Sequence, residues 1–159
     1  MIHAYSGIYD IIGICLRYFN IYGVNQRYDT YGNVIPIFAN CIYSNKPMTI
    51  FGDGEQTRDF INVKDIARAN YLAATTPKGT DVYNLGTGRS ITINKLAELM
   101  KTISGKNVDI KYSQIRSADV MHCKAKTDKA RVGLRFEASV SLEEGLREYM
   151  GWFNMNCVE

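Results

Sequence analysis

Residues that build metal centres or disulfide frameworks are scarce in this sequence. Its 159 residues include two histidines, His3 and His122, and four cysteines that lie far apart and form no C-x-x-C pair. A zinc site is therefore not expected, and we predict no bound metal. No signal peptide is recognisable, so we expect free thiols in a reducing, cytoplasmic setting. The cysteines are Cys15, Cys41, Cys123 and Cys157.

The sequence also lacks an apolar run near 20 residues, and no transmembrane helix is predicted. A net charge of +3 is too small to indicate binding to nucleic acid or to a membrane surface. Hydrophobic residues at 46% and charged residues at 22% are ordinary for one globular domain.

The segment between residues 105 and 135 is basic, with eight Lys or Arg and three Asp. A solvated face is the favoured interpretation, and a rim that attracts an anionic ligand is the alternative.

Familiar catalytic motifs are missing too. The sequence contains no G-x-G-x-x-G fingerprint, no P-loop and no nucleophile elbow. Gly86-Thr87-Gly88 follows a predicted strand, but a plain turn explains two glycines. A Ser–His–Asp set would have to use His3 or His122, and neither has a distinctive context. We predict that no catalytic residue lies in this chain.

What the sequence does contain is an alternation of strand and helix patterns, which predicts an α/β architecture. The apolar run at residues 11–19 suits a buried parallel strand. Residues 20–32 are rich in Asn, Tyr and Gly and are predicted to form a loop, and Gly52-Asp53-Gly54 a turn. Further strands are predicted at residues 48–51, 59–61, 82–85 and 108–112.

Several helix boundaries carry local signals. Asn33 is a plausible N-cap with Pro36 in the first turn. Thr92 caps a helix that Gly105 ends, and Ser141-x-x-Glu144 forms a capping box. Two more helices are predicted, one through residues 66–71 and a short one at residues 127–134.

Several residues are of the types that bind phosphate groups. Asn33 and Val34 begin a predicted helix, where free N–H groups and the dipole favour anions. Arg58 follows a glycine-rich turn, and Arg116 opens a loop beside Asp119. An arginine fork matches phosphate oxygens bidentately. Each arginine alone is more often a structural ion-pair partner, and composition does not decide between the two roles.

Longer motifs carry more information. They are LRYFNIYG at residues 16–23, MTIFGDGEQTRDFINVKD at residues 48–65, YNLGTG at residues 83–88, and the looser Arg116-x-x-Asp119. Together they resemble the extended short-chain dehydrogenase/reductase family of NAD-dependent epimerases and dehydratases. Within it they most resemble UDP-glucose and UDP-N-acetylglucosamine 4-epimerases.

The resemblance implies a fold and a chemistry. The family has an NAD-binding Rossmann domain and a smaller C-terminal substrate domain, and a Tyr-x-x-x-Lys pair accepts the sugar proton while hydride passes to NAD. On that pattern residues 1–159 are the C-terminal substrate-binding portion plus the last strands of the doubly wound parallel sheet. The N-terminal NAD-binding region and the catalytic pair would lie upstream. The isolated chain is then expected to lack oxidoreductase activity and not to retain NAD.

The resemblance also implies roles for individual residues in binding a UDP-sugar. Asn20, Asn33 and Val34 would contact the phosphate region, and Arg58 and Arg116 the diphosphate. Thr49 and Phe51 would offer their backbone to uracil, although Phe51 could be core. Asp119 would lie near the ribose and Tyr18 near the nicotinamide. Asn20 could instead only stabilise its loop, although the surrounding match favours the role in binding.

Cys123 is the one residue that bears on the sugar. In epimerases resembling this one, a tyrosine at that position goes with rejection of N-acetylated sugars and a small residue with acceptance. The physical reason is volume, so Cys123 predicts that an N-acetylhexosamine fits. A small thiol with no role in selection is an equally good interpretation.

Other hypotheses remain open. A nucleotide-sugar 4,6-dehydratase is the nearest rival, which the Arg-Tyr-Phe-Asn run disfavours. The chain could instead be a noncatalytic nucleotide-binding module, or a truncated protein that dimerises or self-associates through the exposed strand at residues 11–19. The sequence departs from the family pattern at Val24, Asn62 and Ser117, which weakens the choice of subfamily more than the family.

Overall fold

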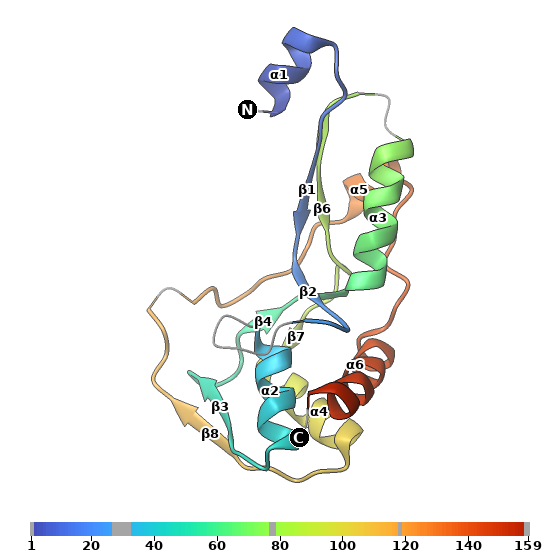
Figure 1. The fold of residues 1–159 in the computed structure, drawn as a ribbon. Helices are drawn as coiled ribbons and strands as arrows, with labels where there is room; N and C mark the ends of the chain where they lie inside the picture. The colour runs from blue at the N-terminus through green and yellow to red at the C-terminus, as the bar shows by residue number, and fades with distance from the viewer. Residues whose placement is uncertain (1, 27–32, 77–78, 118, 158–159) are drawn as a thin grey trace.

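The computed structural model describes residues 2–26, 33–76, 79–117 and 119–157. Its outline is elongated, with helix α1 at one end and helices α2, α4 and α6 gathered at the other (Figure 1). The helices are α1 (Ile2–Tyr9), α2 (Val34–Tyr43), α3 (Val63–Thr75), α4 (Ile93–Ser104), α5 (Asp128–Gly133) and α6 (Leu142–Asn156). The strands are β1 (Ile14–Tyr18), β2 (Asn20–Tyr22), β3 (Met48–Phe51), β4 (Thr57–Arg58), β5 (Phe60–Asn62), β6 (Asp81–Leu85), β7 (Ile91–Thr92) and β8 (Ile110–Ser113).

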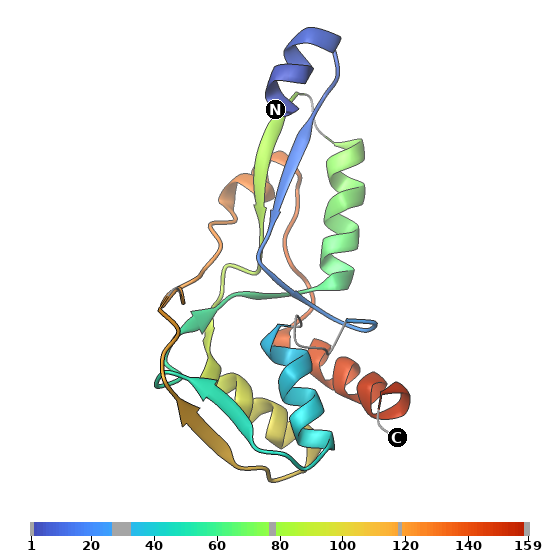
Figure 2. The same cartoon turned by 60° about the vertical axis from the view of Figure 1, so that its left-hand side comes forward.

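The strands form two-stranded pairs, and the predicted α/β class is confirmed. β1 pairs with β6, β2 with β5 and β3 with β8, all in parallel, whereas β4 and β7 are antiparallel. Parallel partners need a crossover connection, and helices supply most of these connections (Figure 2). Within the described residues, no helix has the length and apolar character needed to cross a membrane.

Two predictions in the first part of the chain were wrong. The strand predicted at residues 11–19 is parallel, but it is not buried: Ile11 and Ile12 are more than half exposed, and the strand itself is half-buried to exposed. In the described chain β1 has a strand neighbour on one edge only, β6. The loop predicted at residues 20–32 begins instead with strand β2, whose pairing with β5 overrides its loop-like composition. Residues 27–32 lie outside the described residues.

The predicted helix caps are confirmed. The Asn33 side chain accepts a hydrogen bond from the Ile35 N–H, with Pro36 in the first turn of α2. Thr92 accepts from the Lys95 N–H, and Gly105 ends α4 with a left-handed φ of 67°. Ser141 and Glu144 form the capping box of α6. Each cap satisfies backbone donors or acceptors that the helix leaves unpaired.

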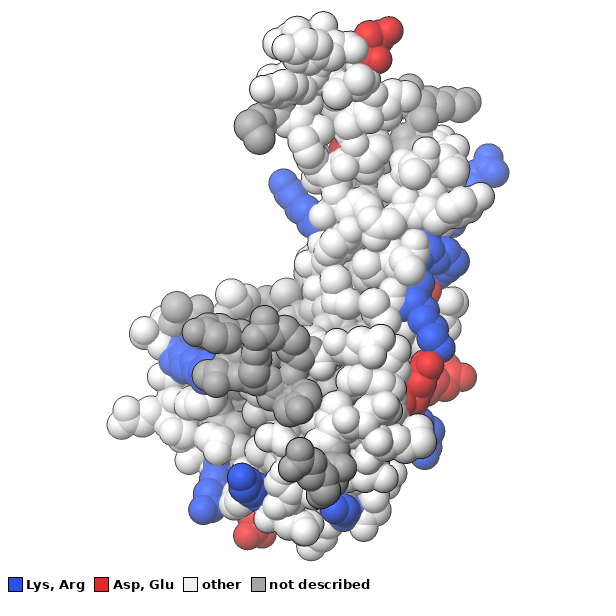
Figure 3. Space-filling view, viewed as in Figure 1, with Lys and Arg blue, Asp and Glu red and all other residues white. Residues whose placement is uncertain are grey.

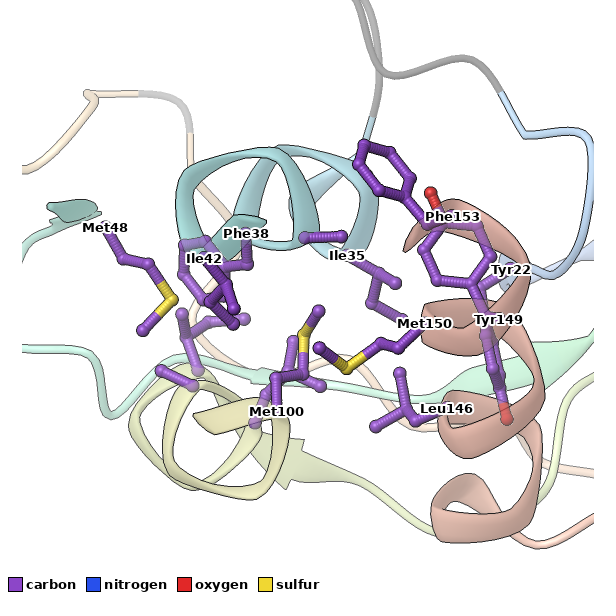
Figure 4. Close-up of a cluster of buried hydrophobic side chains, with 14 of the residues drawn as sticks. Tyr22, Ile35, Phe38, Ile42, Met48, Met100, Leu146, Tyr149, Met150 and Phe153 are labelled. Atoms are coloured by element: carbon purple, nitrogen blue, oxygen red, sulfur yellow. The ribbon is translucent and has the colours of Figure 1, made fainter. Parts of the chain in front are cut away.

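The larger hydrophobic core lies where α2, α4 and α6 meet. Figure 4 shows Phe38 of α2, Met100 of α4 and Met150 of α6 converging there. Tyr22 belongs to the same cluster, and burial raises the pKa of its hydroxyl to about 12. Helix α6 comes close to Tyr22 at Gly145, where an added Cβ would lie 2.1 Å from the tyrosine oxygen. The glycine therefore permits the contact between α6 and β2.

A second core cluster lies between α3, β5, β6 and the segment around α5, and it includes Ile66, Leu85 and Phe136. Asp65 on α3 is buried beside it and accepts hydrogen bonds from the Ser139 and Val140 N–H groups at 3.0 Å each. Burial alone raises the pKa of Asp65, but bonds from Arg68, Val140 and Ser139 outweigh it, so the pKa lies below its usual value. Asp65 thereby ties α3 to the segment that precedes α6.

Candidate functional site

A pocket of about 280 Å³ opens between the start of α2, strand β3, strands β4 and β5, and the loop around residue 116. Eight of the nine substrate-binding residues predicted from the sequence line it, so residues from five separate segments are brought together. They are Asn20, Asn33, Val34, Thr49, Phe51, Arg58, Arg116 and Asp119. The remaining lining residues are Ile37, Phe38, Ile50, Gln56, Phe60 and Ile93.

The first wall of the pocket is the start of α2. The Asn33 amide donates to the Ile21 carbonyl at 2.8 Å, which attaches the helix start to β2, and its oxygen caps Ile35 at 3.1 Å. Both polar atoms of Asn33 are therefore engaged within the protein. The Val34 N–H has no hydrogen-bond partner among the described residues. This N–H group at a helix N-terminus is suited to an anionic ligand.

The second wall is the edge of β3 that faces away from its strand partner β8. The Met48 and Gly52 N–H groups donate toward β8, to Asp109 and Ser113, at 2.9 Å each. Because successive residues of a strand direct their backbone groups to opposite edges, Thr49 and Phe51 direct theirs away from β8. The Gln56 amide donates to the Phe51 carbonyl there at 2.7 Å. Gln56 was not predicted from the sequence, and no local signal marked it.

The two arginines that line the pocket differ in their interaction partners. Arg58 forms an ion pair with Asp119 and also donates to the Thr57 carbonyl at 2.9 Å. Arg116 lies over the Phe51 ring at 3.8 Å and has no carboxylate partner in the part of the chain that the structure describes. The ion pair cancels the charge of Arg58, so Arg116 leaves the pocket with one net positive charge.

Asn20 enters the pocket from β2. Its backbone N–H and its side-chain amide both donate to the Asp59 carbonyl, at 3.1 and 3.0 Å. This double anchor holds the amide side chain in one orientation and engages only one of its two side-chain N–H donors. Asn20 is half-buried.

Two predicted residues lie outside this pocket. Tyr18, at the end of β1, is 44% exposed, and its hydroxyl donates to Asn70 at 2.9 Å. Cys123 is half-buried beside β4, where its N–H donates to the Thr57 carbonyl at 3.2 Å. Neither residue lines the pocket, so the structure leaves both roles as predictions.

The Gly86-Thr87-Gly88 turn has a role that the sequence interpretation missed. Its N–H groups point at the buried Asp59 carboxylate: Thr87 N–H donates at 2.9 Å and Gly88 N–H at 3.0 Å. Successive N–H groups in a turn form an anion-binding concavity, and here an internal carboxylate occupies it. The turn is therefore not free to hold an external phosphate.

The basic segment around residues 105–135 contributes little to the pocket. Lys129 pairs with Asp81, Arg131 with Asp128, and Lys106 lies over the Tyr43 ring. Of the eight basic residues only Arg116 lines the pocket, and Figure 3 shows the charges of the viewed face scattered over the surface. Among the described residues, no group of three or more His, Cys, Asp or Glu is placed to hold a metal ion.

Comparison with known proteins gives consistent matches over almost the whole chain. The model of the NAD dependent epimerase/dehydratase family matches residues 1–86. A UDP-glucuronate 4-epimerase from Thermodesulfobacterium geofontis is 37% identical, over 97% of this chain and 47% of that protein. The chain thus spans about half the length of the curated relatives it matches.

Solved structures agree with these matches. The crystal structure of a UDP-glucose 4-epimerase from Thermotoga maritima, with UDP-glucose, superposes with a TM-score of 0.92 at 36% identity. The match covers 96% of this chain and 49% of that one. A dTDP-glucose 4,6-dehydratase from Bacillus anthracis, in complex with NAD, gives a TM-score of 0.87 at 25% identity over 98% and 49% of the two chains.

Proposed function

Because the chain belongs to the NAD-dependent epimerase/dehydratase family, we propose that it forms the UDP-sugar-binding part of a 4-epimerase. The observation that carries the proposal is the pocket, which brings eight residues from separate segments, all assigned to substrate binding by the resemblance, to one place. Its net positive charge and the edge of β3 that faces away from β8 suit a ligand with a diphosphate at one end and a hydrogen-bonding base at the other.

Each part of the pocket has a chemical task in this proposal. The outward N–H groups of Thr49 and Phe51 and the Thr49 carbonyl face a base such as uracil, which presents an N–H donor beside carbonyl acceptors, while the Phe51 carbonyl accepts from Gln56. Arg116, the Val34 N–H and the second N–H of the Asn20 amide bind the diphosphate. Arg58 contributes its remaining N–H groups, and Asp119 holds Arg58 in place while it accepts from a ribose hydroxyl.

In the whole protein we propose the reaction of the 4-epimerases, in which the sugar C4 is oxidised and then reduced on its other face. NAD supplies and receives the hydride when bound. The described residues do not by themselves fit a dinucleotide, because the N–H groups of the Gly86–Gly88 turn are engaged by Asp59. The 159-residue chain alone is then expected neither to retain NAD nor to catalyse the reaction. Tyr18 is proposed to approach the nicotinamide.

The proposal for the sugar that binds rests on one residue, Cys123. A thiol at this position leaves the volume that a 2-acetamido group needs, so UDP-N-acetylglucosamine is expected to bind at least as well as UDP-glucose. Replacing Cys123 with Tyr fills that volume and is expected to weaken binding of the acetylated sugar only. Equal binding of both sugars to the Cys123→Tyr variant would remove the basis for this choice.

A 4,6-dehydratase remains the second candidate, since a dehydratase with bound NAD is among the structural neighbours. The Arg17-Tyr18-Phe19-Asn20 run favours the epimerase. Product analysis separates the two when the chain is joined to the family's NAD-binding half: an epimerase inverts C4, and a dehydratase releases water. A noncatalytic nucleotide-binding module is the remaining alternative, for which UDP binds but the joined protein forms neither product.

Isothermal titration calorimetry with UDP, uridine and dTDP tests the proposal on the chain itself. UDP is expected to bind one site per chain, and uridine more weakly because it lacks the diphosphate. If no UDP binding is detected at millimolar ligand, the proposed function fails.

A further inference from the structure

Asp59 is the most completely engaged polar side chain near the pocket, although it does not line the pocket. It is fully buried. One carboxylate oxygen accepts from the Thr87 N–H at 2.9 Å and the Thr87 hydroxyl at 2.6 Å. The other accepts from the Gly88 and Ala125 N–H groups at 3.0 Å each. Four donors from two distant segments thus converge on one carboxylate.

The same residue is tied to the pocket through its backbone. The Asp59 carbonyl accepts both bonds that orient Asn20, and its neighbour in the chain is Arg58. The Ala125 N–H belongs to the segment that follows Asp119 and Cys123. A single residue therefore connects β2, β4 and the segment 119–125, and each of them supplies a residue of the predicted site.

These segments are packed without spare room. A Cβ added at Gly86 would lie 2.4 Å from the Ala125 Cβ and 3.0 Å from an Asp59 carboxylate oxygen. Gly86 therefore lies against both Ala125 and the Asp59 carboxylate, and any larger residue there would push them apart. The hydrogen bond from the Ala125 N–H holds this segment against Asp59.

We propose that Asp59 is a positioning residue for the UDP-sugar pocket, one that holds Asn20, Arg58 and the Asp119 segment in their binding arrangement. The inference rests on the proposed function of the pocket. Asp65 provides the contrast. It is also a buried aspartate that binds backbone N–H groups, but its partners, Ser139 and Val140, lie outside the pocket.

This contrast gives a matched experiment. Asn in place of Asp59 retains one acceptor and turns an NH2 group either toward the Thr87 N–H and hydroxyl or toward the Gly88 and Ala125 N–H groups, and it pushes the donors that it faces away. Asp65→Asn makes the same chemical change on a carboxylate remote from the pocket. Both variants are expected to unfold at a lower temperature than the wild type. Affinities for UDP and uridine are then measured by calorimetry, at a temperature where thermal unfolding curves show all proteins to be folded.

The expected result is a UDP affinity about tenfold weaker in Asp59→Asn, with a smaller loss for uridine, which keeps the ribose but lacks the diphosphate, and no change for either ligand in Asp65→Asn. A purely structural role lowers the unfolding temperature without changing the ratio of UDP to uridine affinity. Unchanged UDP affinity in a folded Asp59→Asn variant, or equal losses in both variants, overturns the inference. Failure of the wild type to bind UDP instead overturns the proposed function.

Thr87→Val is the substitute variant for this test if Asp59→Asn does not fold. This substitution removes one donor to the carboxylate and keeps its charge, so a loss of about threefold in UDP affinity is expected. UDP affinity equal to wild type in Thr87→Val would then overturn the inference.

Discussion

Arg58 and Asp119 form an ion pair in the wall of the pocket although they are 61 residues apart in the sequence. Their side chains are mostly buried, with 17% and 26% exposed. The pair fastens β4 to the loop that carries Arg116. It also means that the positive charge of Arg58 is already compensated before any ligand arrives, so the two arginines of the pocket are not equivalent.

The ion pair is expected to couple the two residues energetically. Arg58→Gln and Asp119→Asn should each lower the free energy of unfolding by about 1–2 kcal/mol, because each leaves a partly buried charge without its partner. The double variant should lose less than the two single losses together, with a coupling of about 1 kcal/mol. Urea unfolding of the four proteins measures this, and strictly additive losses would contradict the pairing.

Arg116 is expected to carry most of the attraction for a diphosphate. Arg116→Gln should weaken UDP binding about tenfold, near 1.4 kcal/mol, while leaving uridine binding unchanged. Arg89→Gln is the matched control, since it removes the same charge from an exposed arginine in the neighbouring pocket. Calorimetry at two salt concentrations measures both variants. Equal losses in the two would indicate a general charge effect instead of a specific contact.

The stability of the chain is expected to fall in acid through Asp65. Its pKa is lowered in the folded state from the ordinary value of 3.8. A depressed pKa stabilises the fold above the unfolded value, and this contribution is lost as the pH falls through the folded value. Thermal unfolding between pH 6 and pH 2 should show a decline that begins near pH 4. Asp65→Asn should flatten that decline. An identical slope in the variant would show that other carboxylates, such as Glu144, are responsible.

Two glycines of α6 are expected to respond in opposite ways to alanine. Gly151→Ala should stabilise the protein by about 1 kcal/mol, because Gly151 has no atom within 4 Å of an added Cβ and alanine favours a helix. Gly145→Ala should destabilise it, because its Cβ would meet the Tyr22 oxygen at 2.1 Å. Urea midpoints compare the two. Stabilisation by both substitutions would mean that α6 and β2 do not pack as described.

Local signals in the sequence predicted the helix boundaries well. The side chains of Asn33, Thr92 and Ser141 accept hydrogen bonds from backbone N–H groups no more than three residues later. Such caps can therefore be predicted without knowledge of the fold. The strand at residues 20–22 was missed for the opposite reason. Its composition is that of a loop, and only pairing with β5, about 40 residues away, makes it a strand.

The site was predicted through the family resemblance, and the limits of that route are visible at particular residues. Eight of the assigned residues share one pocket, but the resemblance gave no indication that Asp119 would neutralise Arg58. Nor did it indicate that Asp59 would fill the Gly86–Gly88 turn. Asp59 meets partners 28 to 66 residues away, and such contacts depend on tertiary packing that no local pattern records. The apolar run at residues 11–19 likewise predicted a buried strand, but burial needs neighbouring elements, and the run itself does not specify them.

UDP is proposed to bind between β3 and the start of α2, and amide chemical shifts of the isotope-labelled chain test this binding most directly. On titration with UDP, the resonances of Val34, Thr49 and Phe51 should shift with a common affinity. Those of Ser90 and Ser139, which line the neighbouring pocket, should stay in place. Shifts confined to that neighbouring pocket, or no shifts at millimolar UDP, would contradict the account.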